Sequence, residues 1–346
     1  MPGGFGGRSS LKAEEPEKLP WLIRIDEFVD GRRYQGHRDL AVRVSGMGGG
    51  SSVLNEAVSL NVLATAGEVA QKYAYTSFTV NGRPTTARLV VEHPDETFTD
   101  RIGDDGVLYK SLASSSFTDQ GNDQTDYQDD FQQITKKGSQ DLQPVINLIR
   151  WVTTASDEEF TAKLGDYVDV ESLANYVAVQ NLIANFDDMS GPGKNYYLWY
   201  DLTTKKFSVV GWDYNLTFSG SATTGPHEST TMGGGNFPRQ GGQQQGGQQQ
   251  GGQRGGPGGG IGGNTLKERF LAGAAFTDVY ENAYRELYQK IYGSGTALTA
   301  LDQITTVVEN TKGSDATTLA TESNQLTTFL QERTKSLATD EVIAQG

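Results

Sequence analysis

The sequence predicts an α+β protein with a β-rich N-terminal part and a larger, mostly helical C-terminal part. Residues 73–80 and 85–92 are rich in β-branched and aromatic side chains, and Asn81 and Gly82 between them form the strongest short signal for a β-hairpin. Later segments instead repeat apolar residues at the 3.6-residue period of a helix. These segments are 142–153, 157–164 and 170–184.

The elements before the hairpin follow an irregular lead-in at residues 1–20. Segments 21–25 and 40–44 mix apolar and basic residues as half-buried strands do, and a turn signal separates them. Residues 53–63 place apolar side chains at helical spacing, and Gly67 provides a stop signal. We therefore expect two strands and a helix before the hairpin.

A second small sheet is predicted within the helical part. Residues 106–110 predict a short strand, and segments 196–200 and 207–212 predict a further hairpin after the helix at 170–184. Residues 119–133 are rich in Asp, Gln and Asn, which predicts a solvated loop or linker and a boundary nearby.

Residues 233–263 consist largely of Gln and Gly repeats with almost no apolar side chains, which predicts a disordered insertion. Helical scaffold is expected afterwards at 266–292, 297–310 and 317–337. The predicted organisation is a lead-in, an N-terminal lobe, a part with the active-site segment, the insertion and a helical end. Their bounds are 1–20, 21–118, 119–232, 233–263 and 264–346.

Composition excludes several kinds of chemistry and partner. The chain has no cysteine, so it contains neither disulfides nor thiolate sites, and its three histidines are too scattered for a histidine-based metal centre. A formal charge of −14 disfavours a nucleic-acid backbone as partner. No segment has the apolar length of a membrane span, and no signal peptide is recognisable. Any bound metal is expected to take oxygen ligands.

The densest cluster of candidate functional residues lies within residues 181–218. Asp187 stands on a loop after a predicted helix, Asn195 begins one predicted strand, and Asp213 follows the end of its partner. Paired strands bring the start of the first and the end of the second together, so these side chains are expected to face one site. Carboxylate and amide oxygens together with phosphates suit magnesium, and phosphoryl transfer requires an acid that orients the incoming hydroxyl.

Spacing alone leaves a structural role open for the same residues. Asp and Asn at loop ends often cap helices or form turns. By this reasoning Asp188 is expected to be a solvated neighbour and Trp212 a core residue.

The segments around these residues resemble the CotH family of spore-coat kinases. Asn185-Phe-Asp187, the run Asn-Tyr-Tyr-Leu from Asn195, and Gly-Trp-Asp213 match its pattern at this site. N-terminal segments resemble the motifs of its N-lobe in the same order, and the resemblance covers residues 21–337. These N-terminal segments are 22–36, 54–56, 80–82, 90–92 and 108–110.

The resemblance implies an atypical protein-kinase-like fold with a small β-rich N-lobe and a larger helical C-lobe. It implies a kinase that uses ATP and Mg²⁺ or Mn²⁺ to phosphorylate Ser or Thr of a coat, secreted or surface protein. By the same resemblance, Asp187 is the catalytic acid or base, Asp213 binds the metal, and Asn195 contacts a second metal or the phosphates. The spore coat, the cell surface or the exterior of the cell is the implied location.

The remaining implied site residues belong to the N-terminal part. Arg24 is expected to hold the ATP phosphates and Glu56 to pair with it, as the strand lysine and helix glutamate do in ordinary kinases. Glu92 is expected near the hinge, and Lys110 near a phosphate. No G-x-G-x-x-G loop precedes Arg24, and an arginine in place of lysine addresses phosphates with a planar fork.

Two alternatives of other classes remain. A surface or spore-coat assembly or adhesion module can use the same fold with weak or absent catalysis. A carbohydrate-active enzyme with paired carboxylates accounts for Asp187 and Asp213 but leaves Arg24 and Glu56 unexplained.

Overall fold

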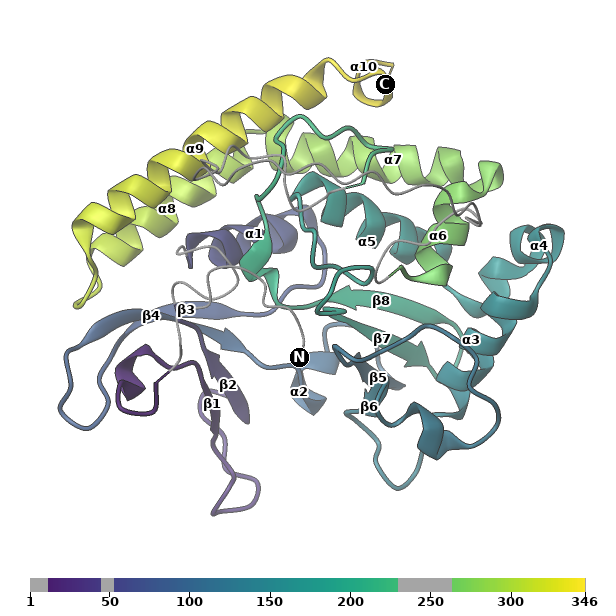
Figure 1. Ribbon diagram of the computed structural model, residues 1–346, viewed down its shortest axis with the longest axis horizontal. Coiled ribbons are helices and arrows are strands. Elements are labelled where there is room, and N and C mark those ends of the chain that lie inside the picture. Colours follow the sequence, from purple (N-terminus) through teal and green to yellow (C-terminus); the bar gives the residue numbers. More distant parts are fainter. Residues whose placement is uncertain (1–11, 45–52, 230–262, 346) are drawn as a thin grey trace, which may run out of the picture.

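A computed structural model describes residues 12–44, 53–229 and 263–345. It confirms the predicted α+β, two-lobed, kinase-like fold, with an N-terminal sheet on one side and a larger helical part on the other (Figure 1). The N-terminal sheet is antiparallel in the order β1-β2-β4-β3. Its strands are β1 (Trp21–Arg24), β2 (Asp39–Val42), β3 (Tyr73–Phe78) and β4 (Thr86–Glu92).

The predicted hairpin is confirmed by the register of β3 and β4, which pairs Tyr73 with Val91 and Phe78 with Thr86. Asn81 and Gly82 both have positive φ angles, 50° and 73°. Adjacent residues of this conformation reverse the chain in the sense that suits the twist of the two strands.

Helix α1 (Leu54–Ala66) is buried on almost all sides, because it lies between the N-terminal sheet and the C-terminal helices (Figure 1). Those helices are α8 (Thr296–Glu309) and α9 (Ala316–Ala338). The helix ends at Gly67, whose φ of 91° suits a residue without a side chain. Its position places a polar residue, Glu56, inside the protein with 2% of its surface exposed.

The second sheet is also antiparallel, in the order β6-β5-β7-β8. Its strands are β5 (Gly106–Ser111), β6 (Phe131–Gln133), β7 (Tyr196–Asp201) and β8 (Phe207–Gly211). Strand β5 therefore pairs with the hairpin of the C-terminal part, so the change of sheet falls between β4 and β5 and not near residue 119.

The segment at 119–133 is largely exposed, as its composition predicted, but it has regular structure and is fixed to the core. It contains a 3₁₀ helix, η3 (Gln124–Tyr127), and strand β6. Tyr127 and Phe131 are 0% and 1% exposed, so two aromatic side chains fix this polar segment to the core. Burial of such large apolar surfaces outweighs the polar neighbours around them.

Besides the 3₁₀ helix η4 (Tyr214–Leu216), the helical part contains nine further helical segments in the described residues, and the predicted helix at 266–292 is divided by Gly273. Ser156 and Asp169 cap α4 and α5 through their side chains. The predicted insertion at 233–263 lies, apart from its last residue, outside the described residues. The segments are α2 (Glu96–Thr99), α3 (Gln143–Thr154), α4 (Asp157–Tyr167), α5 (Val170–Leu182), α6 (Thr265–Ala272), η5 (Ala274–Phe276), α7 (Thr277–Tyr288), the π-helix η6 (Gln289–Gly293) and α10 (Glu341–Ala344).

One continuous cluster of buried apolar side chains joins α1, both sheets and the C-terminal helices. A charged residue, Arg333 of α9, is also fully buried there and donates hydrogen bonds to backbone carbonyls of two separate segments. No helix in the described parts of the chain combines the length and apolar character needed to cross a bilayer.

Candidate active site

Asp187 occupies the loop between α5 and β7, and its carboxylate is held by two donors. The backbone N–H of Gly193 donates to Oδ1 over 2.5 Å, and Nδ2 of Asn195 donates to Oδ2 over 2.9 Å. Burial raises the pKa of Asp187, and the nearby charges of Asp213 and Asp188 act in the same direction. Asp187 and Asn195 are therefore in direct contact, and Asp213 lies close enough for its charge to act on Asp187.

Two glycines allow this loop to close around Asp187. A Cβ atom on Gly191 would lie 2.4 Å from the Cα of Asp187, and one on Gly193 would lie 2.6 Å from its Oδ2. Neither contact is tolerable between atoms, so the Gly-Pro-Gly turn is required for the position of the carboxylate.

Asp213 follows β8 in a left-handed backbone conformation, with φ of 57°. Its neighbour Trp212 donates its backbone N–H to the carbonyl of Asn195 over 3.2 Å, which fixes the start of β7 beside the end of β8. The Asp213 side chain is 26% exposed, and its Oδ1 lies 3.1 Å from Nη2 of Arg43. A strained residue with a half-exposed carboxylate at this point is typical of a functional site.

Arg43 follows β2 and is the basic residue that reaches the helix glutamate. Its Nη2 lies 2.6 Å from Oε1 of Glu56, the buried acid of α1. Burial raises the pKa of Glu56, whereas the guanidinium of Arg43 opposes that change. Arg43 thus contacts Glu56 and Asp213 at once, and it joins the N-terminal lobe to the segment after β8.

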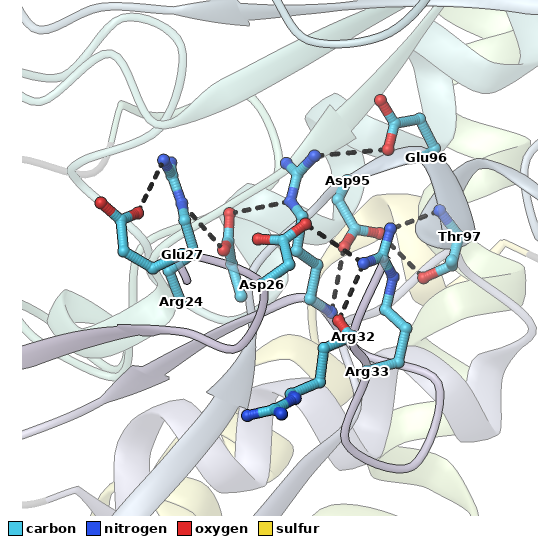
Figure 2. Close-up of polar contacts among 10 residues, drawn as sticks. Arg24, Asp26, Glu27, Arg32, Arg33, Asp95, Glu96 and Thr97 are labelled. Atoms are coloured by element: carbon cyan, nitrogen blue, oxygen red, sulfur yellow. Dashed lines mark hydrogen bonds and ion pairs between the residues drawn. The ribbon is translucent and has the colours of Figure 1, made fainter. Parts of the chain in front are cut away.

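The predicted pair of Arg24 with Glu56 is wrong. Arg24 lies on the edge strand β1 with an exposed side chain, 3.5 Å from Glu27 and 3.5 Å from Asp39 (Figure 2). All four residues of β1 are exposed, whereas three of the four residues of β2 are buried. Sequence reasoning missed Arg43 because both arginines stand near the end of an apolar segment, at 21–25 and 40–44, and only the pairing of the strands tells them apart.

Trp212 lies at the centre of several charged and polar side chains. The guanidinium carbon of Arg43 is 5.1 Å from its ring centroid, and Nζ of Lys110 is 5.7 Å from the same centroid. Tyr197 packs edge-on against the ring at 6.1 Å. Burial lowers the pKa of Lys110, and the charge of Asp213 opposes this shift. Trp212 is thus buried as predicted and also contacts two cations.

Glu92 ends β4 at the start of the segment that joins the two sheets. Its buried carboxylate contacts Arg101, lies 3.2 Å from Nδ1 of His37, and accepts the backbone N–H of Lys72 over 3.0 Å. These contacts hold the end of β4 to the N-terminal sheet and to the segment that leads to β5.

Asp188 is not the solvated neighbour that its position predicted. It is 3% exposed and forms an ion pair with Lys267 of α6, and it accepts the backbone N–H of Ser190 over 2.8 Å. The loop after α5 folds inward because α6, distant in sequence, supplies this cation.

His93 packs edge-on against Trp212, with 5.2 Å between the ring centroids. Burial lowers its pKa from 6.5 to about 4, and Lys110 and Arg43 act in the same direction, whereas Asp39 and Asp95 oppose it. The folded protein therefore favours the neutral ring.

Stability should consequently fall as the pH falls from about 6.5 towards 4, because the unfolded chain binds a proton that the folded chain excludes. Between about pH 7.5 and pH 5 this group should contribute a loss of about 2 kcal/mol. Urea unfolding of His93→Gln at both pH values checks it: the variant should lose about that much less than the unaltered chain. Equal losses would contradict a neutral buried His93.

The oxygen ligands at this site are too few for a hard cation by themselves and suit one only together with a phosphate compound. No group of three or more His, Cys, Asp or Glu side chains gathers at one point in the described ranges. Asp213 and Asn195 offer carboxylate and amide oxygens, and a magnesium ion commonly completes so small a set with water and substrate phosphates. The residues therefore fit a metal that arrives with a phosphate compound.

Two cavities lie elsewhere in the protein. One of about 270 Å³ lies between η6, α8 and α9, and one of about 180 Å³ lies between α1, α5 and β8. Neither is lined by Asp187 or Asp213, so the assignment of the site depends on its polar contacts.

A protein-family model described as CotH kinase protein matches residues 5–337, nearly the whole chain. No curated protein matches the sequence.

Proposed function

Because the chain belongs to the CotH kinase family, we propose that it is an ATP- and metal-dependent protein kinase that phosphorylates Ser or Thr of a coat, secreted or surface protein. The family supports a kinase-like spore-coat protein. The observation that best supports catalysis is the position of Asp187, held by Gly193 and Asn195 beside the charge of Asp213.

In this proposal Asp187 accepts the proton of the attacking Ser or Thr hydroxyl. The hydroxyl oxygen bonds to the terminal phosphorus of ATP, and the bond from that phosphorus to ADP breaks. The raised pKa of Asp187 favours proton acceptance. The Asn195 amide and the Gly193 N–H fix the carboxylate for this task. Asp213 and Asn195 would hold the divalent metal, which neutralises phosphate charge when bound.

The phosphates are assigned to Arg43 and Lys110 in place of Arg24. Arg43 is already fixed by Glu56, and both cations lie against Trp212 beside Asp213. Arg24 is oriented towards Glu27 and Asp39 on the far edge of the sheet. The planar guanidinium of an arginine presents a rigid fork of donors that matches phosphate oxygens, so Arg43 can take the phosphate-binding role that a lysine has in ordinary kinases.

A thermal-unfolding titration with ATP, alone and with Mg²⁺ or Mn²⁺, tests the function. We expect stabilisation only with metal, of about 2.7 kcal/mol when the ligand is at about 100 times its Kd. Asp213→Asn should remove this stabilisation, and Asp302→Asn on the exposed face of α8 should retain it. Absence of any shift with either metal would contradict the nucleotide site.

One observation favours the assembly or adhesion module as a second candidate. Strand β1 is an edge strand with no further neighbour among the described residues, and apolar side chains on it and the following loop are exposed. Phe28 is 96% exposed and Leu22 is 55% exposed. Exposed apolar edges commonly mark association surfaces. A chain that shows no nucleotide shift, but loses self-association or partner binding in Phe28→Ser, would support this candidate.

A further inference from the structure

Arg43 contacts two carboxylates, Glu56 and Asp213, which differ in how much their charged forms depend on its guanidinium. Glu56 is 2% exposed in α1, so its charge depends on the guanidinium 2.6 Å away. The contact with Asp213 is weaker: its Oδ1 is buried 3.1 Å from Nη2 of Arg43 but accepts no hydrogen bond, and the side chain as a whole is 26% exposed. Removal of a fully buried ionic partner is costly, whereas removal of a partner from a partly exposed carboxylate costs less. Arg43 is therefore fixed to Glu56 and exchangeable at Asp213.

The same site contains buried donors that lack an acceptor. Nε of Arg43 and the hydroxyl of Tyr197 are both buried, and neither has a hydrogen-bond partner among the described residues. Tyr197 is influenced by the charges of Asp213 and Arg43, so its hydroxyl belongs to the same group. Buried donors of this kind are normally satisfied by a ligand or by water. Phosphate oxygens would supply the acceptors.

The charges of Arg43, Lys110, Glu56 and Asp213 are balanced, and Asp187 adds one further carboxylate near Asp213. Arg43 and Lys110 oppose Glu56 and Asp213, and Lys110 is influenced by both Asp213 and Arg43. A divalent cation alone would add positive charge beside two existing cations. A polyphosphate alone would add negative charge beside Asp213. When the cation and the polyphosphate bind together, the polyphosphate offsets the repulsion between the cation and the two basic side chains, and the cation offsets the repulsion between the polyphosphate and Asp213.

We propose that Arg43 is an exchangeable counter-ion of Asp213, so that a nucleotide polyphosphate must draw Arg43 away before the metal can bind Asp213 fully. This inference rests on the proposed function and specifies the order of two events at its site: movement of Arg43 to the polyphosphate, then full binding of the metal by Asp213. The metal alone binds weakly, and the polyphosphate and the metal increase each other's affinity by the same factor, as linkage requires.

Titration of the full chain with Mn²⁺ alone, followed by electron paramagnetic resonance of the free ion, tests the proposal. Since Arg43→Met alone leaves Glu56 buried without a partner, the informative variant is Arg43→Met with Glu56→Met, which replaces the pair by apolar side chains. We expect this double variant to bind Mn²⁺ alone about tenfold more tightly than the unaltered chain. Adding Asp213→Asn should abolish the gain.

Arg83→Met provides the matched control, because Arg83 is half-exposed, 3.8 Å from Glu17, and outside the site. Its Mn²⁺ affinity should equal that of the unaltered chain. Equal affinity of the double variant and the unaltered chain would overturn the exchange while leaving the kinase proposal intact. Failure of the unaltered chain and the double variant to bind Mn²⁺, with or without ATP, would overturn both the exchange and the metal site of the proposed function.

Discussion

Arg333→Met should lower the free energy of unfolding by about 4 kcal/mol. Arg333 is fully buried and donates hydrogen bonds to the carbonyls of Asn181, Leu182, Ala222 and Thr224, at distances of 2.6 to 3.1 Å. A methionine fills much of the volume but donates nothing, so several buried carbonyls lose their partners. Urea unfolding at neutral pH measures the loss.

Lys335→Met, on the exposed side of the same helix, is the control and should change stability by less than about 0.5 kcal/mol. The effect of Arg333 is specific because its carbonyl partners lie before the Asp187 loop and after the Asp213 segment. Similar stability of the two variants would show that water replaces the guanidinium at those carbonyls.

Asp187→Asn should reduce phosphoryl transfer by about 10² to 10⁴ and leave metal-dependent nucleotide binding nearly unchanged. The amide keeps the volume of the side chain and an oxygen for the Gly193 N–H, but it does not accept a proton from the substrate hydroxyl. ATP consumption and incorporation of labelled phosphate measure the transfer, and thermal unfolding with ATP and Mn²⁺ measures binding.

The pH dependence provides a second measure of the same role. Because burial raises the pKa of Asp187, transfer by the unaltered chain should fall as the pH decreases through that raised pKa. Asp302→Asn serves again as control and should transfer phosphate normally. Unchanged turnover in Asp187→Asn would exclude Asp187 as the proton acceptor, and a loss of binding alone would assign it to the ligand.

The sequence predicted the elements whose signals are local. The Asn81-Gly82 hairpin, the capped helices α4 and α5, and the hairpin that carries Asp213 all have patterns within a few residues of each other. The approach of Asn195 to the segment that carries Asp213 was predictable too, because paired strands bring the start of the first and the end of the second together.

The errors concern contacts between segments far apart in the chain. Neither Arg24 nor Arg43 carries a local signal that tells an edge strand from an inner one, since that depends on which strands pair. The burial of Asp188 depends on Lys267, which lies 79 residues later. The polar composition of 119–133 concealed Tyr127 and Phe131: Phe131 lies on β6, which pairs with β5, and Tyr127 lies on η3, which packs against α3.

The membership of β5 in the second sheet has a mechanical consequence. Lys110 and Asp213 belong to one sheet and its hairpin, so their separation is set by a single rigid unit. Arg43 belongs to the other sheet, which is joined to the first through the short chain at 93–105 and through packing of α1. A rotation of one lobe against the other would therefore change the distance from Arg43 to Asp213 while preserving that from Lys110 to Asp213. A ligand that contacts Arg43 on one sheet and Lys110 on the other would therefore oppose such a rotation and hold the two lobes together.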